Sequence, residues 1–514
     1  MKGGEVRAQR VEDTPGGRLP AVADPLRPFE SRSAGVATTE RVLFGRLTTE
    51  DPVQAVVRRI RTAIGLGILT DGQKLPKEAD LARQLGVTAF SLREALSALR
   101  DAGLIVTRVG KNGGSYVQRP PASDSIAEEQ LTGLTATELR DLGDWRAVLV
   151  TYAAWLAAQR ASAASSDRLA SYAEELADAD TAAAARRALG RFHVELAAAA
   201  QSMRLTRAEL ALHEEFDWLV QVLLRDETHR RAIVRTMLEV SATVRAGDAA
   251  AAWVAGEQLT AYLVTELTRS RLRLIAAGSA GPGPKRRRAG DIVAELRRIS
   301  KQTVGILEDI ADDVAAGVTM PPTSGELNGV VARSVLPRLG RVEDLVHGVG
   351  FMAEVGLLPE AEYWMEWWQR ASDGTFDRDY SHQLDPSLDD FYEYGSQDYL
   401  TRPRATGRPN AMGPYIDHGG VDDYLVTVSL PVAREGTFLG VICIDIRVAG
   451  LERALSPWLA RADGTCLVLN AESRVLLSNA VRYNVGDVLP QSSDLSLTDV
   501  GWFGWVVARA PEEP

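Results

Sequence analysis

Basic side chains gather in one short part of this acidic chain. The full sequence carries 58 Lys and Arg against 69 Asp and Glu, a formal net charge of −11. Between Asp51 and Gln118, however, ten Lys and Arg stand against six Asp and Glu, a local balance of +4. Lys and Arg are the residues that neutralise nucleic-acid phosphates. This distribution is compatible with a small DNA-binding module on an acidic body.

The residues that serve enzymes as nucleophiles, bases or metal ligands form no recognisable pattern. Only six His and two Cys, Cys443 and Cys466, occur in the chain. The sequence has no nucleophile elbow, no phosphate loop and no His–Glu zinc motif. One Cys pair makes neither a disulfide framework nor a Cys-rich zinc site. An enzyme, for example a hydrolase in the C-terminal part, is therefore an unsupported alternative, and we predict no catalytic residue, metal or cofactor.

Apolar spacing and turn residues predict three helices around the basic residues. The first has Val56, Ile60 and Ile64 on one face at four-residue spacing. The second ends at the turn residue Gly86, and the third runs from Phe90 to Ala102. These helices would form a compact unit with a shared apolar core.

Thr88 is placed to cap the third helix, because its hydroxyl can accept a hydrogen bond from a free amide of the first turn. Two short apolar segments, 104–107 and 115–117, then flank a glycine-rich loop at 109–114. The order helix, helix, turn, helix, hairpin is typical of a winged helix-turn-helix. In such a unit the third helix lies in the DNA major groove, and the loop reaches a phosphate or a minor-groove edge.

This stretch resembles the GntR family of regulators, in its FadR-like branch. The resemblance implies a homodimer on double-stranded DNA, with two half-sites about one helical turn apart. Ala79 and Ala89 stand where the family often has Arg, so we expect weaker or differently distributed phosphate contacts. The matching motifs are Leu75-Pro76-Lys77-Glu78, Leu81-Ala82, Leu85-Gly86-Val87-Thr88, Leu92-Arg93-Glu94-Ala95-Leu96, Leu99, Gly103-Leu104 and the wing 110–117. The residues implied to contact DNA are Lys77, Thr88, Ser91, Arg93, Gly110 and Lys111.

Residues 125–278 have the Ala- and Leu-rich one-turn spacing of an all-helical bundle. They resemble FCD, the helical ligand-binding domain of the FadR-like branch, through Asp144-Trp145-Arg146 and Arg191-Phe192-His193. The metal ligands of that family, one Asp and three His, do not carry over. Leu189 stands four residues before His193 in place of the Asp, and His229 is one residue out of register. We therefore predict that this domain has lost its metal site, that His193 is a packed helix residue, and that the domain dimerises and relays a signal.

Residues 290–514 are predicted to form an α+β domain. A long helix is expected over 290–320, followed by clustered aromatic residues. The strand patterns are 424–431, 438–446, 465–470, 475–478 and 502–508. The run 412–446 resembles Cache domains, which are PAS-like sheets with a ligand pocket above the central strands.

The amino-acid-sensing branch of Cache domains uses a spaced set of polar pocket residues. The resemblance matches Tyr392, Tyr415, Asp417 and Asp445 to the residues that hold a ligand ammonium through carboxylate charge and an aromatic face.

The half of the pocket that binds a ligand carboxylate departs from that branch. Gln397 replaces an Arg and Tyr399 replaces a Trp, so the carboxylate loses its bidentate partner. Arg402 and Arg404 are candidates to replace it. We therefore expect a small cationic or amine-bearing effector, bound also by Gln397 and Tyr399.

The predicted architecture is multidomain: a winged helix-turn-helix, an all-α helical bundle and an α+β PAS-like (Cache) domain. Neither a signal peptide nor a run of roughly 18 apolar residues occurs, so we expect a cytoplasmic protein without a membrane contact. The predicted function is a DNA-binding transcription regulator controlled by a small-molecule effector. A sensor or scaffold that has lost sequence-specific DNA binding is the alternative. The predicted boundaries are a disordered tail (1–48), the winged helix (49–119), the FCD-like domain (125–278), a linker (279–289) and the Cache-like domain (290–514).

Overall fold

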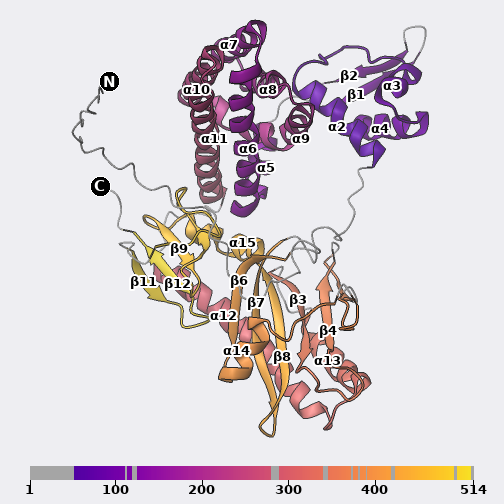
Figure 1. Cartoon of the computed structure of the whole chain (residues 1–514), viewed down its shortest axis with the longest axis vertical. Coiled ribbons are helices and arrows are strands. Elements are labelled where there is room, and N and C mark those ends of the chain that lie inside the picture. The colour runs from indigo at the N-terminus through magenta and orange to yellow at the C-terminus, as the bar shows by residue number, and fades with distance from the viewer. Residues whose placement is uncertain are drawn as a thin grey trace, which may run out of the picture.

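The computed structural model describes residues 51–109, 113–118, 124–278, 289–339, 345–371, 374–379, 382–388, 391–417, 423–490 and 495–510. The predicted tail, the wing residues Gly110 and Lys111, and residues 279–288 of the predicted linker lie outside the described residues. The described parts form a winged-helix unit, a helical bundle and a C-terminal region with two β-sheets (Figure 1). No helix among them is long and apolar enough to cross a lipid bilayer.

The winged-helix unit has the predicted order of elements. Val56, Ile60 and Ile64 are buried, and they share one core with the apolar face of the third helix. Gly86 follows the second helix with φ +69°, a left-handed conformation that glycine adopts without steric cost. The elements are α2 (Pro52–Gly65), α3 (Glu78–Leu85), α4 (Ala89–Asp101), β1 (Ile105–Arg108) and β2 (Gly114–Val117).

The prediction of an all-helical bundle for residues 125–278 is confirmed. Helices α6 and α11 run side by side along its length (Figure 1), and small residues allow their close approach. A Cβ atom on Gly256 of α11 would lie 3.2 Å from the Cα of Thr151 on α6. The elements are α5 (Asp124–Gly133), α6 (Ala136–Arg160), α7 (Ala163–Ala177), α8 (Ala182–Ala199), α9 (Met203–Val220), the 3-10 turn η1 (Leu223–Arg225), α10 (Glu227–Ala246) and α11 (Ala249–Gly278).

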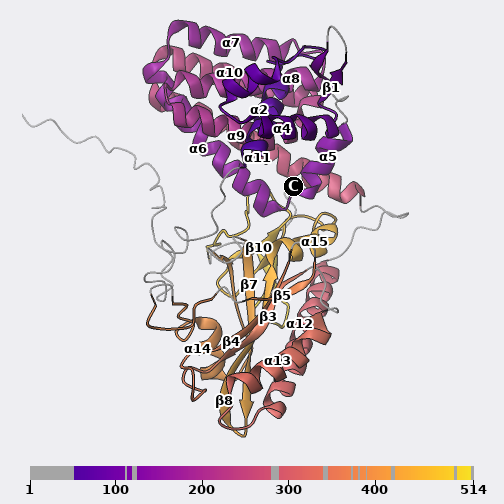
Figure 2. The ribbon, with the colours of Figure 1, turned by 90° about the vertical axis from the view of Figure 1, so that its right-hand side faces the viewer.

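The larger C-terminal sheet is antiparallel, with the strand order β5-β4-β3-β8-β7-β6. Helices α12 and α13 cover one face and α14 lies on the other (Figure 2), which is the layered, PAS-like arrangement that was predicted. The strands are β3 (Val346–Ala353), β4 (Met365–Arg370), β5 (Phe376–Asp379), β6 (Asn410–Ile416), β7 (Tyr424–Arg434) and β8 (Thr437–Arg447). The helices are α12 (Ala289–Gly317), α13 (Ser324–Leu339) and α14 (Asp398–Thr406), so α12 begins at the last residue of the predicted linker.

A second, four-stranded sheet follows the first, whereas the sequence had suggested a single unit. Its strand order is β10-β9-β12-β11. Helix α15 (Val448–Leu459) connects the two sheets and begins directly where β8 ends. The strands are β9 (Cys466–Leu469), β10 (Val475–Ser478), β11 (Ser496–Asp499) and β12 (Val506–Arg509).

Candidate nucleic-acid interface and effector site

The first turn of α4 is fixed by the predicted cap. The Thr88 hydroxyl oxygen accepts a hydrogen bond from the Ser91 amide at 3.1 Å, and α4 begins at Ala89. The hydroxyls of Thr88 and Ser91 lie 3.0 Å apart. This contact fixes the direction of α4 relative to the preceding turn. The N-terminal end of α4, which would enter a DNA groove, is exposed.

The predicted DNA-contacting side chains in the described residues lie around that end of α4. The Arg93 side chain is 67% exposed and makes a long ion pair, 3.9 Å, with Glu78. Lys77 is exposed at the start of α3. Exposed ion pairs contribute little free energy, so a phosphate or a base edge can displace Glu78 from Arg93.

The end of β1 and the two departures from the family also face solvent. Arg108 of β1 stacks on the Tyr116 ring at 4.4 Å, and Arg100 of α4 donates a hydrogen bond to Thr107 at 3.1 Å. Ala79 and Ala89 are exposed, so at both positions a methyl group faces solvent where the family often has an Arg.

Three ionisable residues of α9 form a buried cluster with Arg146 inside the helical bundle. The Arg146 Nη2 atom lies 3.0 Å from Asp217, and its Nη1 atom pairs with Glu209. His213 lies 2.5 Å from the other Asp217 oxygen. Arg146 is completely buried and its three partners are nearly so. Sequence reasoning placed Arg146 but missed the others, although their four-residue spacing puts them on one helix face.

Charge interactions connect the side chains of this cluster. Burial lowers the pKa of His193 to about 3, with a further contribution from Arg146, so the ring is neutral. Burial alone would raise the pKa of Asp217, but His213 and Arg146 outweigh it and hold the carboxyl ionised. In the described part of the chain, no three His, Cys, Asp or Glu residues are arranged to hold a metal ion. The Arg146 guanidinium supplies positive charge beside these carboxylates.

The predicted ammonium-binding residues meet on the face of the larger sheet that carries α14. Thr427 donates a hydrogen bond to Asp445 at 2.6 Å from the neighbouring strand, and the Tyr415 hydroxyl lies 2.7 Å from Thr427. Burial raises the pKa of Asp445 to about 7; the Thr427 hydroxyl opposes the rise and the charge of Asp417 adds to it. The side chains of Asp445 and Tyr415 are half-buried.

Aromatic rings line the same face. The Tyr392 and Tyr399 hydroxyls lie 2.8 Å apart. Trp367 covers two glycines of β3, since a Cβ atom on Gly348 would lie 2.7 Å from the indole nitrogen. Gly348 is the register partner of Asp445, so Trp367 lies close to the carboxylate. Sequence reasoning did not single out Thr427 or the glycines, because both act across strands.

The arginines that were candidates to bind a ligand carboxylate are engaged elsewhere. Arg402 pairs with Asp398 at 2.9 Å, and Arg404 pairs with Glu354 at 2.7 Å. Gln397 lies at the start of α14 and donates to a backbone carbonyl at 3.4 Å. The site therefore presents acidic and aromatic groups, and the replacement of the missing Arg by Arg402 or Arg404 stays a prediction.

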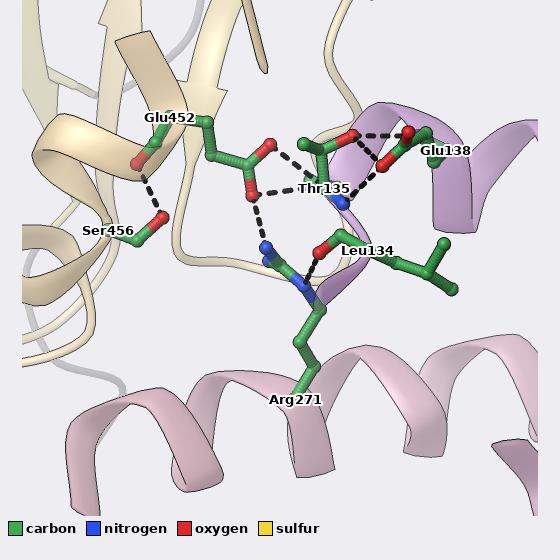
Figure 3. Close-up of polar contacts among 7 residues, drawn as sticks. Leu134, Thr135, Glu138, Arg271, Glu452 and Ser456 are labelled. Carbon is green, nitrogen blue, oxygen red and sulfur yellow. Dashed lines mark hydrogen bonds and ion pairs between the residues drawn. The ribbon is translucent and has the colours of Figure 1, made fainter. Parts of the chain in front are cut away.

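The helical bundle and the sheet domain meet at a buried polar junction (Figure 3). Both carboxylate oxygens of Glu452 accept hydrogen bonds from the Ala136 amide, at 2.9 and 2.7 Å, at the first turn of α6. Arg271 of α11 lies 2.7 Å from Glu452 and donates a second hydrogen bond to the Leu134 carbonyl at 2.6 Å. A carboxylate at a helix N-terminus is favoured by the free amides and the helix dipole. Burial raises the pKa of Glu452, although Arg271 and the Ala136 amide both favour its charged form.

A second contact lies beside this junction. Arg140 of α6 donates hydrogen bonds to the Tyr424 hydroxyl, at 3.1 Å, and to the Val485 carbonyl. Tyr424 begins β7 directly after Asp423, whose carbonyl accepts a hydrogen bond from the Asp417 amide at 3.2 Å. Two elements of the candidate effector site, β8 and the end of β6, are thus linked to α6.

The sequence profile of bacterial regulatory proteins of the gntR family matches residues 52–117, and that of the FCD domain matches residues 141–259. An HTH-type transcriptional regulator, RmpR of Mycobacterium gastri, is 40% identical over 174 residues, which are 34% of this chain and 64% of that protein. An L-lactate dehydrogenase operon regulatory protein of Escherichia coli is 32% identical over 171 residues, 32% of this chain and 62% of that protein. The chain thus spans slightly less than two thirds of these curated relatives, which are named as regulators and not as enzymes.

Solved structures match parts of the chain. The ligand-binding domain of the Pseudomonas fluorescens chemoreceptor CtaA in complex with L-valine is 14% identical and covers 44% of this chain and 94% of that chain, with a TM-score of 0.30. GntR of Streptococcus agalactiae is 19% identical and covers 42% of this chain and 99% of that chain, with a TM-score of 0.24. Residues 52–117 are thus similar to bacterial regulatory proteins of the gntR family, and residues 141–259 are similar to the FCD domain.

Proposed function

We propose that the protein is a transcription regulator whose affinity for its operator is controlled by an amine-bearing small molecule bound beside Asp445. The observation that carries the proposal is the short path from this site, along β8 and α15, to the contact between Glu452 and the helical bundle. Asp445 lies near the end of β8, α15 follows without a loop, and Glu452 of α15 binds the first turn of α6. A ligand that moves β8 would therefore act directly on α6.

The path continues from α6 to the winged helix. Arg146, further along α6, holds α9 through Glu209 and Asp217. Helix α9 packs against α2 of the winged helix, where a Cβ atom on Gly65 would lie 3.5 Å from the His213 ring. Since one winged helix reads one half-site, we further propose a homodimer, in which a shift of α6 changes the spacing of the two recognition helices.

The chemistry around Asp445 supports a cationic ligand. Acidic and aromatic side chains attract an ammonium group through charge and through the ring faces. A thermal-shift screen of alkylamines, amino acids and dicarboxylates on the full chain tests this point, because a ligand that binds only the native state raises its stability. Stabilisation by amines is the expected result. Stabilisation by dicarboxylates and by no amine would contradict the proposed ligand class.

Arg93→Ala should weaken operator binding by about 1–3 kcal/mol, because Arg93 is the exposed cation on the first turns of α4 and a bidentate contact to guanine has that value. Fluorescence anisotropy with an operator selected from random duplexes measures the change. Arg61→Ala, which removes an exposed cation from α2, is the matched control for the loss of one charge. An unchanged affinity for Arg93→Ala would remove its assigned role. Failure of the wild-type protein to bind any duplex, even at low salt, would favour the alternative of a sensor without DNA binding.

Glu452→Gln should uncouple the two sites while leaving each able to bind. The amide oxygen can still accept a hydrogen bond from Ala136, but without its charge it binds the N-terminus of α6 more weakly, and it leaves Arg271 without its buried charge partner, so the contact of α15 with α6 and α11 is weakened. We expect the effector to change operator affinity by about 5–150-fold in the wild type and by less than about threefold in the variant. The measurement is operator affinity with and without a saturating amine from the screen.

The control for this variant is Arg273→Gln, which changes an exposed arginine on the same helix as Arg271. It should keep wild-type coupling. If Glu452→Gln folds, binds both ligands and retains full coupling, the junction does not transmit the signal.

A further inference from the structure

One large apolar side chain lies exposed on the recognition helix. Phe90 is the second residue of α4, and it is 68% exposed. The opposite face of α4 carries Leu92, Leu96 and Leu99, which are buried in the core of the winged helix. Isolated exposed apolar residues are common on protein surfaces, so exposure alone does not indicate a function for Phe90. Its position on the recognition helix is the relevant observation.

That position is the start of the exposed stripe of α4. Four exposed residues of α4 have the three- and four-residue spacing that places them on one helix face: Phe90, Arg93, Glu94 and Ser97. In helix-turn-helix proteins the N-terminal residues of the recognition helix are those that contact base edges. The Thr88 cap fixes this first turn, so Phe90 is presented in a defined direction rather than on a frayed end.

A phenyl ring can recognise only one feature of the major groove. The base edges there offer hydrogen-bond donors and acceptors, which Phe cannot use, and the thymine C5 methyl group, which it can. Phe90 and Arg93 are separated by about 4.5 Å along the helix axis, close to one base step. A thymine read by Phe90 would thus lie within one or two steps of the base read by Arg93.

We propose that Phe90 is a specificity-determining residue that selects a thymine in each half-site through contact with its C5 methyl group. The inference rests on the proposed DNA binding and adds to it a base preference. Arg93 supplies the polar contact of this face and Phe90 the apolar one.

The experiment uses the full chain and an operator selected from random duplexes. Each thymine is replaced in turn by deoxyuridine, which removes only the methyl group, and affinities are measured for the wild type and for Phe90→Ala. In the wild type one deoxyuridine position in each half-site should cost about fourfold, the effect expected for one buried methyl group. In Phe90→Ala the same position should cost less than about 1.5-fold.

Ile68→Ala is the matched control, since Ile68 is 65% exposed in the same unit but outside α4, and it should keep the wild-type deoxyuridine profile. Equal deoxyuridine profiles for the wild type and Phe90→Ala would overturn the inference, even if both bind DNA. Selection of no sequence at all would overturn the proposed DNA binding, and the inference with it.

Discussion

Asp445→Asn is expected to weaken binding of an amine effector by at least about 30-fold and to abolish the pH dependence of that binding. Removing one partner of a desolvated, hydrogen-bonded charge pair costs about 2 kcal/mol or more. The Asn side chain preserves the shape and can still accept the Thr427 hydrogen bond, so the loss reports the charge of Asp445.

The pH dependence follows from the raised pKa of Asp445. In the empty site the carboxyl has a pKa of about 7, so below that pH it holds a proton that an ammonium ligand must expel. The dissociation constant should therefore rise by about tenfold for each unit of pH below 7 and remain level above it. Calorimetry should detect release of about one proton per ligand near pH 6 and little release at pH 8.

The raised pKa of Asp445 also determines whether this carboxyl stabilises the fold at low or at high pH. The folded protein keeps the Asp445 proton up to about pH 7, whereas the unfolded chain releases it near the ordinary aspartate pKa of 3.8. Stability contributed by this group is therefore present at low pH and is lost as the pH rises through about 4 to 7. Ligand-free Asp445→Asn should be more stable than the wild type at pH 8.

Cys443→Ser is the matched control for Asp445→Asn, because Cys443 lies on the same strand and the same face of the sheet. It should leave the pH dependence of amine binding intact. An affinity that is constant from pH 5.5 to 8 in the wild type would exclude Asp445 as the counter-ion of the ligand.

Local signals in the sequence predicted much of this architecture. The capping residue Thr88 and the glycine after α3 placed α4 to within one residue at each end. Strands β7 and β8 were found because a buried apolar run is bounded by turn residues. Strand β3, by contrast, is buried on both faces, and its glycines and His347 interrupt the apolar run that would mark it. No periodicity separates such a strand from a loop.

The parts of the sites that sequence reasoning missed depend on contacts between distant residues. Thr427 reaches Asp445 only through the β7–β8 register, and Arg271 reaches Glu452 only when the bundle docks on the sheet domain. Glu209 and Asp217 have the spacing of residues on any helix surface, where charged residues are usual. The burial of these residues is a property of the assembled bundle, and nothing in the local sequence distinguishes it.

Arg146→Met is expected to lower the free energy of unfolding of the helical bundle by about 3–5 kcal/mol. The guanidinium is completely buried between the Glu209 and Asp217 carboxylates, whose side chains are only 2% and 1% exposed. Met matches the length of the arginine stem but leaves Glu209 without its buried cation and Asp217 with His213 alone, and an uncompensated buried charge carries a penalty of this size. Urea unfolding of the full chain, followed by hydrogen exchange in α6 and α9, measures the loss where it occurs.

Two further variants separate charge from packing. Arg231→Met removes a cation from an exposed pair with Glu227, and it should change stability by less than about 0.5 kcal/mol. The triple variant Arg146→Met, Glu209→Gln, Asp217→Asn removes the buried charges of all three residues. It should recover most of the stability lost in the single variant. The reason is that a buried ion cluster can be replaced by neutral groups of similar volume at little cost in stability. If the triple variant is less stable than Arg146→Met, the destabilisation arises from lost packing around α6 and α9, and the network does not act through its charge.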